Sequence, residues 1–122
     1  MNSKVGKTEK MGRGMFAMRD IKKDEVIEEC EIITFSPDDR ILIDKTCFYN
    51  YYFGWCDGKG AIALGNGSLY NHSYSPNTRY DKNFDKGIIS FIAIKDISAD
   101  DEITVNYNGD PSNQEKIWFD AQ

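Results

Sequence analysis

A dense polar loop holds the single histidine of the chain. It reads NHSYSPN at residues 71–77. Asparagine and histidine side chains carry both hydrogen-bond donors and acceptors, so they could connect neighbouring loops or hold a ligand, and Pro76 stiffens the exit. Taken alone, an Asn-His-Ser sequence is more typical of a hydrogen-bonded turn than of a ligand site.

Two further segments contain residue types that suit a cofactor or a substrate. The glycines of GRGMFA at residues 12–17 would let backbone groups approach a cofactor closely, although a simple hairpin explains this short motif better. In DEITVNYNG at residues 101–109, Tyr107 ends a strand-like run, and its hydroxyl could orient a substrate nitrogen. By itself Tyr107 is more typical of an ordinary half-buried tyrosine.

Short strands must position these segments. The strand-like runs are residues 26–35, 60–64, 88–94 and 102–107. The last run alternates apolar and polar residues, which predicts one buried face. Glycine-rich loops, where the backbone needs positive φ or a close approach, are expected at residues 12–14, 58–60 and 65–67.

Helical signals are fewer and predict one or two short helices. Ser36 is an N-cap candidate, followed by Pro37 at the first helical position and by two aspartates near the positive end of the helix dipole. A capping box that starts at Ser112 predicts a final helical turn over residues 116–121, which contains Trp118 and Phe119.

Length and composition predict one domain. A chain of 122 residues with 40% hydrophobic and 29% charged residues fits a single folded core. The three cysteines are odd in number and lack metal-ligand spacing, so free thiols are expected. No apolar run approaches the ~20 residues of a membrane span, and no secretory signal is evident, which predicts a cytoplasmic or nuclear protein.

The net charge of −5 disfavours direct binding to nucleic acid and favours a basic partner. A modest negative charge that only keeps the protein in solution is an equally good explanation.

The three motifs, taken together and in this order, resemble the SET-domain family of protein lysine methyltransferases. The resemblance covers about residues 5–107, and the chain is similar in size to the minimal viral and bacterial SET proteins. It implies a mostly-β fold of the β-clip class, with several small curled sheets and a pseudoknot-like C-terminal threading. Residues 1–122 would form a single SET domain, with residues 108–122 as a closing segment.

The resemblance also implies the ligands and the site residues. The methyl donor would be S-adenosylmethionine, and its contacts would come from Arg13, Gly14, Met15, Tyr70, Asn71, His72, Tyr107 and Trp118. The catalytic residues would be Tyr107, Tyr80 and Tyr51, with Tyr52 as the next candidate. No metal or covalent nucleophile is required.

The reaction needs a neutral lysine amine. An apolar, aromatic channel would disfavour the ammonium form, while Tyr107 would orient the amine rather than act as its base, because a tyrosine pKa is near ~10. The chain departs from the family pattern at Asp100, where a turn glycine is common, and at Ser68-Leu69, where many members have Arg-Phe. The zinc-binding cysteine cluster that follows many SET cores is absent from the sequence, so another element must close the channel.

The sequence leaves several alternatives open. One is a non-catalytic SET-like module that binds a peptide or the cofactor, and a weaker one is a metal-dependent hydrolase or nuclease. The substrate protein, such as a histone or another basic tail, the degree of methylation and a homodimeric state are not fixed by the sequence.

Overall fold

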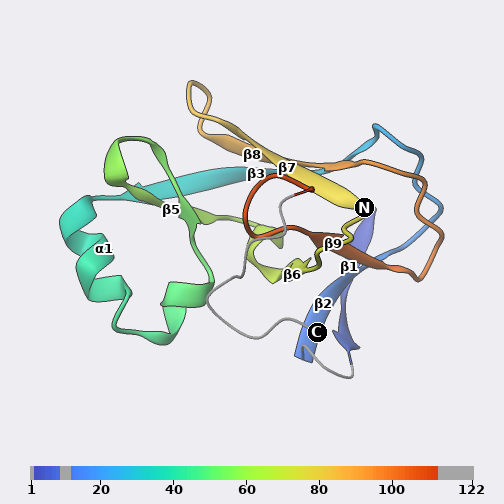
Figure 1. Ribbon diagram of the computed structural model, residues 1–122, viewed down its shortest axis with the longest axis horizontal. Coiled ribbons are helices and arrows are strands. Elements are labelled where there is room, and N and C mark those ends of the chain that lie inside the picture. The colour runs from blue at the N-terminus through green and yellow to red at the C-terminus, as the bar shows by residue number, and fades with distance from the viewer. Residues whose placement is uncertain (1, 9–11, 113–122) are drawn as a thin grey trace.

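The computed structural model describes residues 2–8 and 12–112 of the chain. Within these ranges the secondary structure follows the order β1 (Ser3–Thr8), β2 (Gly12–Ala17), β3 (Val26–Phe35), α1 (Pro37–Ile43), β4 (Phe53–Gly54), β5 (Gly60–Ala63), β6 (Asn71–His72), β7 (Thr78–Asn83), β8 (Ile88–Ala93) and β9 (Glu102–Val105). Short 3-10 helices are found at Cys47–Asn50, Cys56–Gly58 and Gly67–Leu69. The fold is therefore mostly β (Figure 1).

The strands form two sheets. The smaller sheet has the order β1-β2-β9-β6 and the larger has the order β4-β5-β3-β8-β7. Neighbouring strands are antiparallel except for β6 and β9, which pair in parallel through Asn71 with Thr104 and His72 with Val105. The C-terminal strand thus lies between β2 and the histidine loop, the pairing that the predicted pseudoknot-like arrangement requires.

The larger sheet curls until its two edge strands meet. Phe53 lies on edge strand β4 and Tyr80 on edge strand β7, yet their ring centroids are 5.1 Å apart in an edge-to-face contact. Such aromatic pairs are favourable at this separation. The curl brings side chains from both ends of the sheet to one place.

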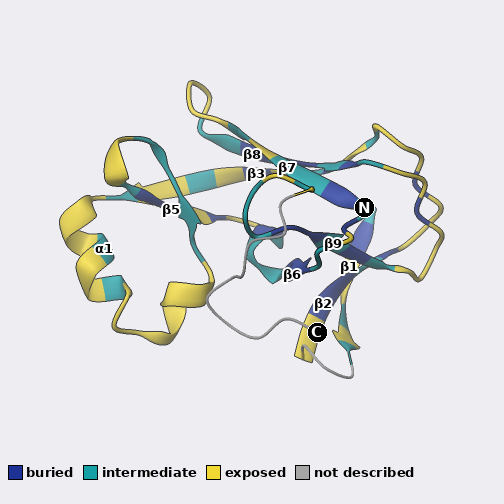
Figure 2. Cartoon of the chain, viewed as in Figure 1, coloured by how far each residue is buried: buried dark blue, intermediate teal, exposed yellow. Residues whose placement is uncertain are grey.

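The hydrophobic core joins the two sheets. Met15 and Ile103 from the smaller sheet pack in one cluster with Ile89 and Phe91 from β8, and all four are fully buried. Figure 2 shows the buried residues gathered along the central strands, whereas α1 has no buried residue and stands at one end of the molecule. The central strands therefore form the packed part of the molecule, from which the surrounding loops extend.

Several local predictions are confirmed. Strand β3 has the predicted bounds, while β5, β8 and β9 end one or two residues earlier than expected. Helix α1 begins after Ser36, whose Oγ accepts a hydrogen bond of 3.1 Å from the backbone N–H of Asp39. The GRGMFA segment forms one arm of the β1–β2 hairpin.

Strands β1, β4, β6 and β7 were not predicted. Strands β4 and β6 contain two residues each, too few to show a periodic pattern. Strand β7, TRYDKN, is an edge strand with one fully buried residue, so its sequence lacks the apolar alternation of a half-buried strand. The predicted helical turn over residues 116–121 lies outside the described residues.

In the turn before β9, Asp100 takes the place of the glycine that is common in the family. Asp100 adopts a φ of 71°, the left-handed conformation in which glycine is most at ease. Aspartate tolerates this conformation better than most residues. The departure from the family pattern therefore leaves the turn before β9 intact.

In the described part of the chain, the helices are too short and too polar to cross a membrane.

Candidate active site

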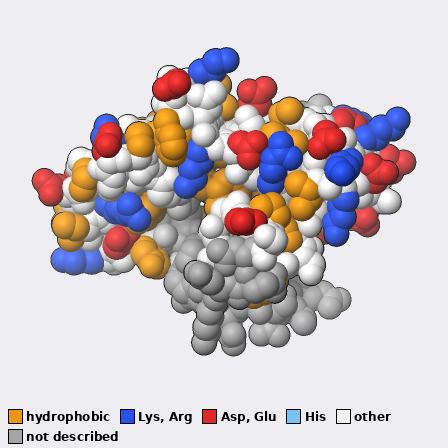
Figure 3. Space-filling view, turned by 45° about the horizontal axis from the view of Figure 1, so that its top comes forward, with side chains coloured by type: hydrophobic (Ala, Val, Ile, Leu, Met, Phe, Trp, Pro, Cys, Tyr) orange, Lys and Arg blue, Asp and Glu red, His pale blue; other side chains and the backbone are white. Residues whose placement is uncertain are grey.

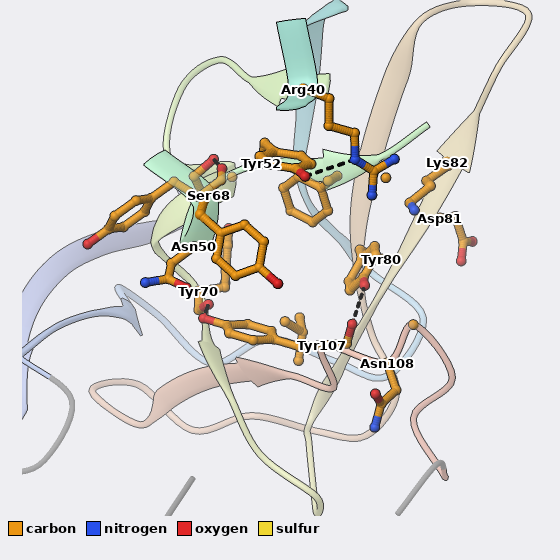
Figure 4. Close-up of a pocket in the computed structure, with 17 residues that line it drawn as sticks. Arg40, Asn50, Tyr52, Ser68, Tyr70, Tyr80, Asp81, Lys82, Tyr107 and Asn108 are labelled. Atoms are coloured by element: carbon orange, nitrogen blue, oxygen red, sulfur yellow. Dashed lines mark hydrogen bonds between the residues drawn. The ribbon is translucent and has the colours of Figure 1, made fainter. Parts of the chain in front are cut away.

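A cavity of about 760 Å³ lies where the curled sheet meets the C-terminal end of β9. Six tyrosines from different parts of the sequence line it: Tyr49, Tyr51, Tyr52, Tyr70, Tyr80 and Tyr107. Figure 4 shows Tyr70, Tyr80 and Tyr107 around this space. The structure thus brings together the three predicted catalytic tyrosines, the next candidate Tyr52 and the predicted cofactor contact Tyr70.

Tyr107 is fixed to the histidine loop by two hydrogen bonds. Its phenol donates to the backbone carbonyl oxygen of Tyr70 at 2.7 Å, and its backbone N–H donates to Nδ1 of His72 at 2.9 Å. Tyr80 adds a third contact, a hydrogen bond of 3.3 Å from its hydroxyl to the carbonyl oxygen of Tyr107. The phenol of Tyr107 therefore has a defined position at the wall of the cavity.

The cavity keeps these phenols protonated. Burial raises the pKa of Tyr80 to about 12. Burial also raises the pKa of Tyr107 well above its ordinary value, and the nearby phenols of Tyr51 and Tyr80 and the carboxylate of Glu102 raise it further. Both tyrosines are hydrogen-bond donors near neutral pH, and neither can serve as a general base there.

A second group of candidate residues, called the second cluster below, consists of Arg13 and Gly14 of β2, Asn71 and His72 of β6 and Glu102 of β9. The side-chain amide of Asn71 donates to the carbonyl oxygen of Arg13 at 2.9 Å and to Oε2 of Glu102 at 2.8 Å. A Cβ atom on Gly14 would lie 2.5 Å from the same Glu102 oxygen and 2.8 Å from Nδ2 of Asn71. The side chains of Glu102 and Asn71 therefore occupy the space that a Cβ atom would take at residue 14.

The second cluster contains predicted cofactor contacts that do not line the cavity. Arg13, Gly14, Asn71 and His72 lie beside it, and Asn71 directly follows the cavity residue Tyr70. The side chain of Met15 is fully buried in the hydrophobic core, so only its backbone is left for such a contact. Trp118, the remaining predicted contact, lies outside the described residues, as does Phe119.

His72 is neutral in the folded protein. Because Nδ1 accepts the N–H of Tyr107, the ring proton resides on Nε2. That nitrogen is buried and has no hydrogen-bond partner among the described residues. Burial lowers the pKa of His72, so the ring stays uncharged at neutral pH.

Glu28 holds Tyr70 in place at the cavity wall, and this role was not predicted from the sequence. Its two carboxylate oxygens accept hydrogen bonds from the hydroxyl of Tyr70 at 2.7 Å and from the backbone N–H of Asn66 at 3.0 Å. Tyr70 in turn stacks on Phe91 with ring centroids 4.3 Å apart. Sequence offered no signal for this role, because the partners are far apart in the chain.

Two cations at the cavity were also missed. Arg40 of α1 and Lys82 of β7 both line it. Lys82 lies two residues after Tyr80 on the same strand, so the two side chains share a face. If β7 had been predicted, this spacing of two residues would have indicated that Lys82 lies near the cavity.

Among residues 2–8 and 12–112, histidine, cysteine, aspartate and glutamate do not gather in a group of three or more that could hold a metal ion.

Comparison with known proteins agrees with this fold and site. The SET domain matches residues 12–108, and the chain therefore belongs to the SET-domain family. It is 29% identical over 116 residues to a Schizosaccharomyces pombe histone-lysine N-methyltransferase that is specific for H3 lysine-37, covering 94% of this chain and 75% of that protein.

Solved structures show the same fold. A candidate histone methyltransferase of Plasmodium falciparum is similar with a TM-score of 0.67 and 27% identity, over 87% of this chain and 92% of that one. Polycomb Repressive Complex 2 of Chaetomium thermophilum, in an autoinhibited conformation bound to S-adenosylmethionine, has a TM-score of 0.72 and 26% identity, over 86% of this chain but 15% of its own. The enzyme class of the chain is protein-lysine methyltransferase.

Proposed function

We propose that the protein transfers a methyl group from S-adenosylmethionine to the ε-amine of a lysine in a protein substrate. The observation that carries this proposal is the position of Tyr107, whose phenol is hydrogen-bonded to the loop of His72 while it lines a tyrosine-rich cavity. We also propose that residues 5–107 form the core of the domain and that residues 108–122 are the segment that closes the channel.

The second cluster fits a cofactor that carries an ammonium group and hydrogen-bonding ring atoms. Both N–H groups of the Asn71 amide are used by Arg13 and Glu102, whereas its Oδ1 makes no hydrogen bond with the described residues and is available to an ammonium group. The buried Nε2–H of His72 is a donor that also lacks a partner there. Arg13, Gly14, Asn71 and His72 are therefore the residues that would hold the cofactor.

When bound, S-adenosylmethionine supplies an electrophilic methyl group. The residues of the chain would bind and orient the lysine amine. Because the Tyr107 hydroxyl already donates its proton to the carbonyl oxygen of Tyr70, its oxygen would accept a hydrogen bond from an N–H of the amine, and Tyr80 and Tyr51 would form the aromatic walls. Fixing two reacting groups in this way can lower a barrier by up to ~7–11 kcal/mol in the best cases.

The cavity also favours loss of the lysine proton. Lys82, which already lies in its wall, has a lowered pKa because of burial and because of the neighbouring charge of Arg40. A target lysine that enters the same space would meet the same two effects. Since neither Tyr107 nor Tyr80 can accept the proton near neutral pH, it would pass to water.

A histone or another basic protein is the proposed substrate, because the relative in Schizosaccharomyces pombe is a histone-lysine methyltransferase and because this chain carries a net charge of −5. A histone substrate would imply action in the nucleus.

Radiolabelled S-adenosylmethionine tests the proposal when it is mixed with the full chain and either histones or a cell extract. We expect label on protein, and mass spectrometry of the products should locate it on lysine. If calorimetry shows that the chain binds peptides but no cofactor, and no label is transferred, the protein is a binding module and the proposal fails.

A further inference from the structure

We propose that the cavity selects lysines with an acidic side chain nearby in the substrate chain, and that Arg40 and Lys82 recognise its carboxylate. This inference rests on the proposed function, because it names the substrate class of the same cavity.

The two cations reach the cavity from separate elements. Figure 4 shows Arg40 of α1 and Lys82 of β7 directed toward the same end of the space. Nζ of Lys82 lies 6.0 Å from the ring centroid of Tyr80, and the guanidinium carbon of Arg40 lies 5.3 Å from that of Tyr52. Aromatic rings thus hold both charges in place.

Internal hydrogen bonds hold the guanidinium group of Arg40 and leave part of it available. Its Nε donates to the hydroxyl of Tyr52 at 2.9 Å, and one terminal nitrogen donates to the carbonyl oxygens of Gly58 and Lys59 at 3.3 Å each. The other terminal nitrogen makes no hydrogen bond with the described residues. A fixed guanidinium with free N–H groups suits a carboxylate ligand.

Neither cation has a carboxylate partner within the described ranges. The acidic residue that also lines the cavity, Asp81, pairs with Arg79 at 3.3 Å. Asp44, near Arg40, accepts the hydroxyl of Tyr52 at 2.6 Å. Burial and the charge of Arg40 lower the pKa of Lys82, so the two cations stand close together at a cost that an added anion would relieve.

This local charge is opposite to that of the whole chain. Acidic and basic side chains are interspersed over the face seen in Figure 3, and the chain carries −5 overall. A general excess of positive charge therefore does not explain two neighbouring cations at one cavity. A recognition site for an anion does.

The distance between Tyr80 and Lys82 determines how far the acidic residue should lie from the target lysine in the substrate. Tyr80, which contacts Tyr107, and Lys82 are two residues apart on one face of β7, a separation of ~7 Å in a strand. An extended peptide covers that distance in about two residues. We therefore expect the acidic residue within about three residues of the target lysine.

Binding of fluorescent peptides measures this directly and does not depend on turnover. Short peptides have one central lysine in a Gly-Ser background, and a glutamate or a glutamine is moved through the flanking positions. We expect glutamate to bind about fivefold more tightly than glutamine at one position, with a smaller ratio at high salt. Equal binding of all glutamate and glutamine pairs would overturn the inference.

Variants assign the effect to the two cations. Lys82→Gln should abolish the preference for glutamate, Lys82→Glu should reverse it so that the glutamine peptide binds more tightly, and Arg40→Gln should weaken it. Lys86→Gln is the matched control, because it removes one exposed positive charge from the β7–β8 turn, outside the cavity. A preference that survives in Lys82→Gln and Lys82→Glu contradicts the assignment.

Methylation of the same peptides separates this inference from the proposed function. If label is transferred equally to glutamate and glutamine peptides, the proposed methyl transfer is supported and the recognition of a carboxylate is wrong. If glutamate peptides bind more tightly but no label is transferred, the recognition of a carboxylate is supported and the proposed methyl transfer is wrong. If Lys82→Gln shifts the pH profile of methylation but leaves the glutamate preference unchanged, Lys82 acts on the target amine and does not bind a carboxylate.

Discussion

The phenol of Tyr107 donates a hydrogen bond of 2.7 Å to the backbone carbonyl oxygen of Tyr70, the residue immediately before Asn71 and His72. One bond thus links the end of β9 to the loop that leads into β6. It fixes the hydroxyl oxygen of Tyr107 at the cavity wall, and it depends on the parallel pairing of these two strands.

Removal of this hydroxyl should separate activity from folding. In Tyr107→Phe the ring stays in place and one hydrogen bond is lost, so the free energy of unfolding should fall by about 1 kcal/mol. Methyl transfer should fall on the order of a hundredfold, because the amine loses the hydroxyl oxygen that orients it. Urea denaturation and label transfer measure the two effects; unchanged turnover would show that the hydroxyl has no part in the reaction.

The carboxylate of Glu28 should support Tyr70. In Glu28→Gln the shape is kept, but one of the two acceptors becomes a donor that faces a donor, so the free energy of unfolding should fall by about 1–2 kcal/mol. Chemical denaturation measures the loss. Glu29→Gln, at the exposed neighbouring position, should stay within about 0.5 kcal/mol of the wild type, and a similar loss in both variants would point to a general charge effect.

His72 should make the fold sensitive to mild acid. Burial lowers its pKa in the folded state below the ordinary value of about 6.5, so its stabilising contribution is present above that pH and is lost as the pH falls through the lowered pKa. Protonation of Nδ1 would also remove the acceptor of the Tyr107 N–H. The free energy of unfolding, measured by urea denaturation between about pH 7.5 and 5, should decline by at most about 1.4 kcal/mol per pH unit from this group.

The control for this pH dependence is His72→Gln. Its side-chain oxygen can still accept the N–H of Tyr107, but the side chain does not titrate. The decline between about pH 6.5 and 5 should be smaller in this variant. His72 is the only histidine in the sequence, so an equal decline would assign the effect to carboxylates.

The two glycines at the start of β2 should respond differently to alanine. Gly14→Ala would force a methyl group against Asn71 and Glu102, which should cost about 2–3 kcal/mol and weaken cofactor binding. Gly12 has a φ of 74°, and the space that a methyl group would take there has no atom within 4 Å, so Gly12→Ala should cost roughly 1 kcal/mol from backbone strain alone. Thermal unfolding and calorimetry with the cofactor compare them; equal costs would mean that the close approach at Gly14 is unimportant.

Local sequence determined much of the fold, because several signals act over a few residues. Ser36 and Pro37 start a helix by capping and by a preset φ, whatever the rest of the chain does. The long β3 run and the alternating β9 run predicted strands for similar reasons. The order of the three motifs then predicted the family and the meeting of Tyr107 with the histidine loop.

Tertiary structure alone decided the rest of the site. Lys82 lies near Arg40, and Glu28 near Tyr70, because a five-stranded sheet curls until its edges meet and because β6 and β9 pair in parallel. Neither contact leaves a periodic trace in the sequence, since each joins side chains far apart in the chain. The sequence by itself determined which residues could do chemistry, and the curl of the sheet decided which charges surround them.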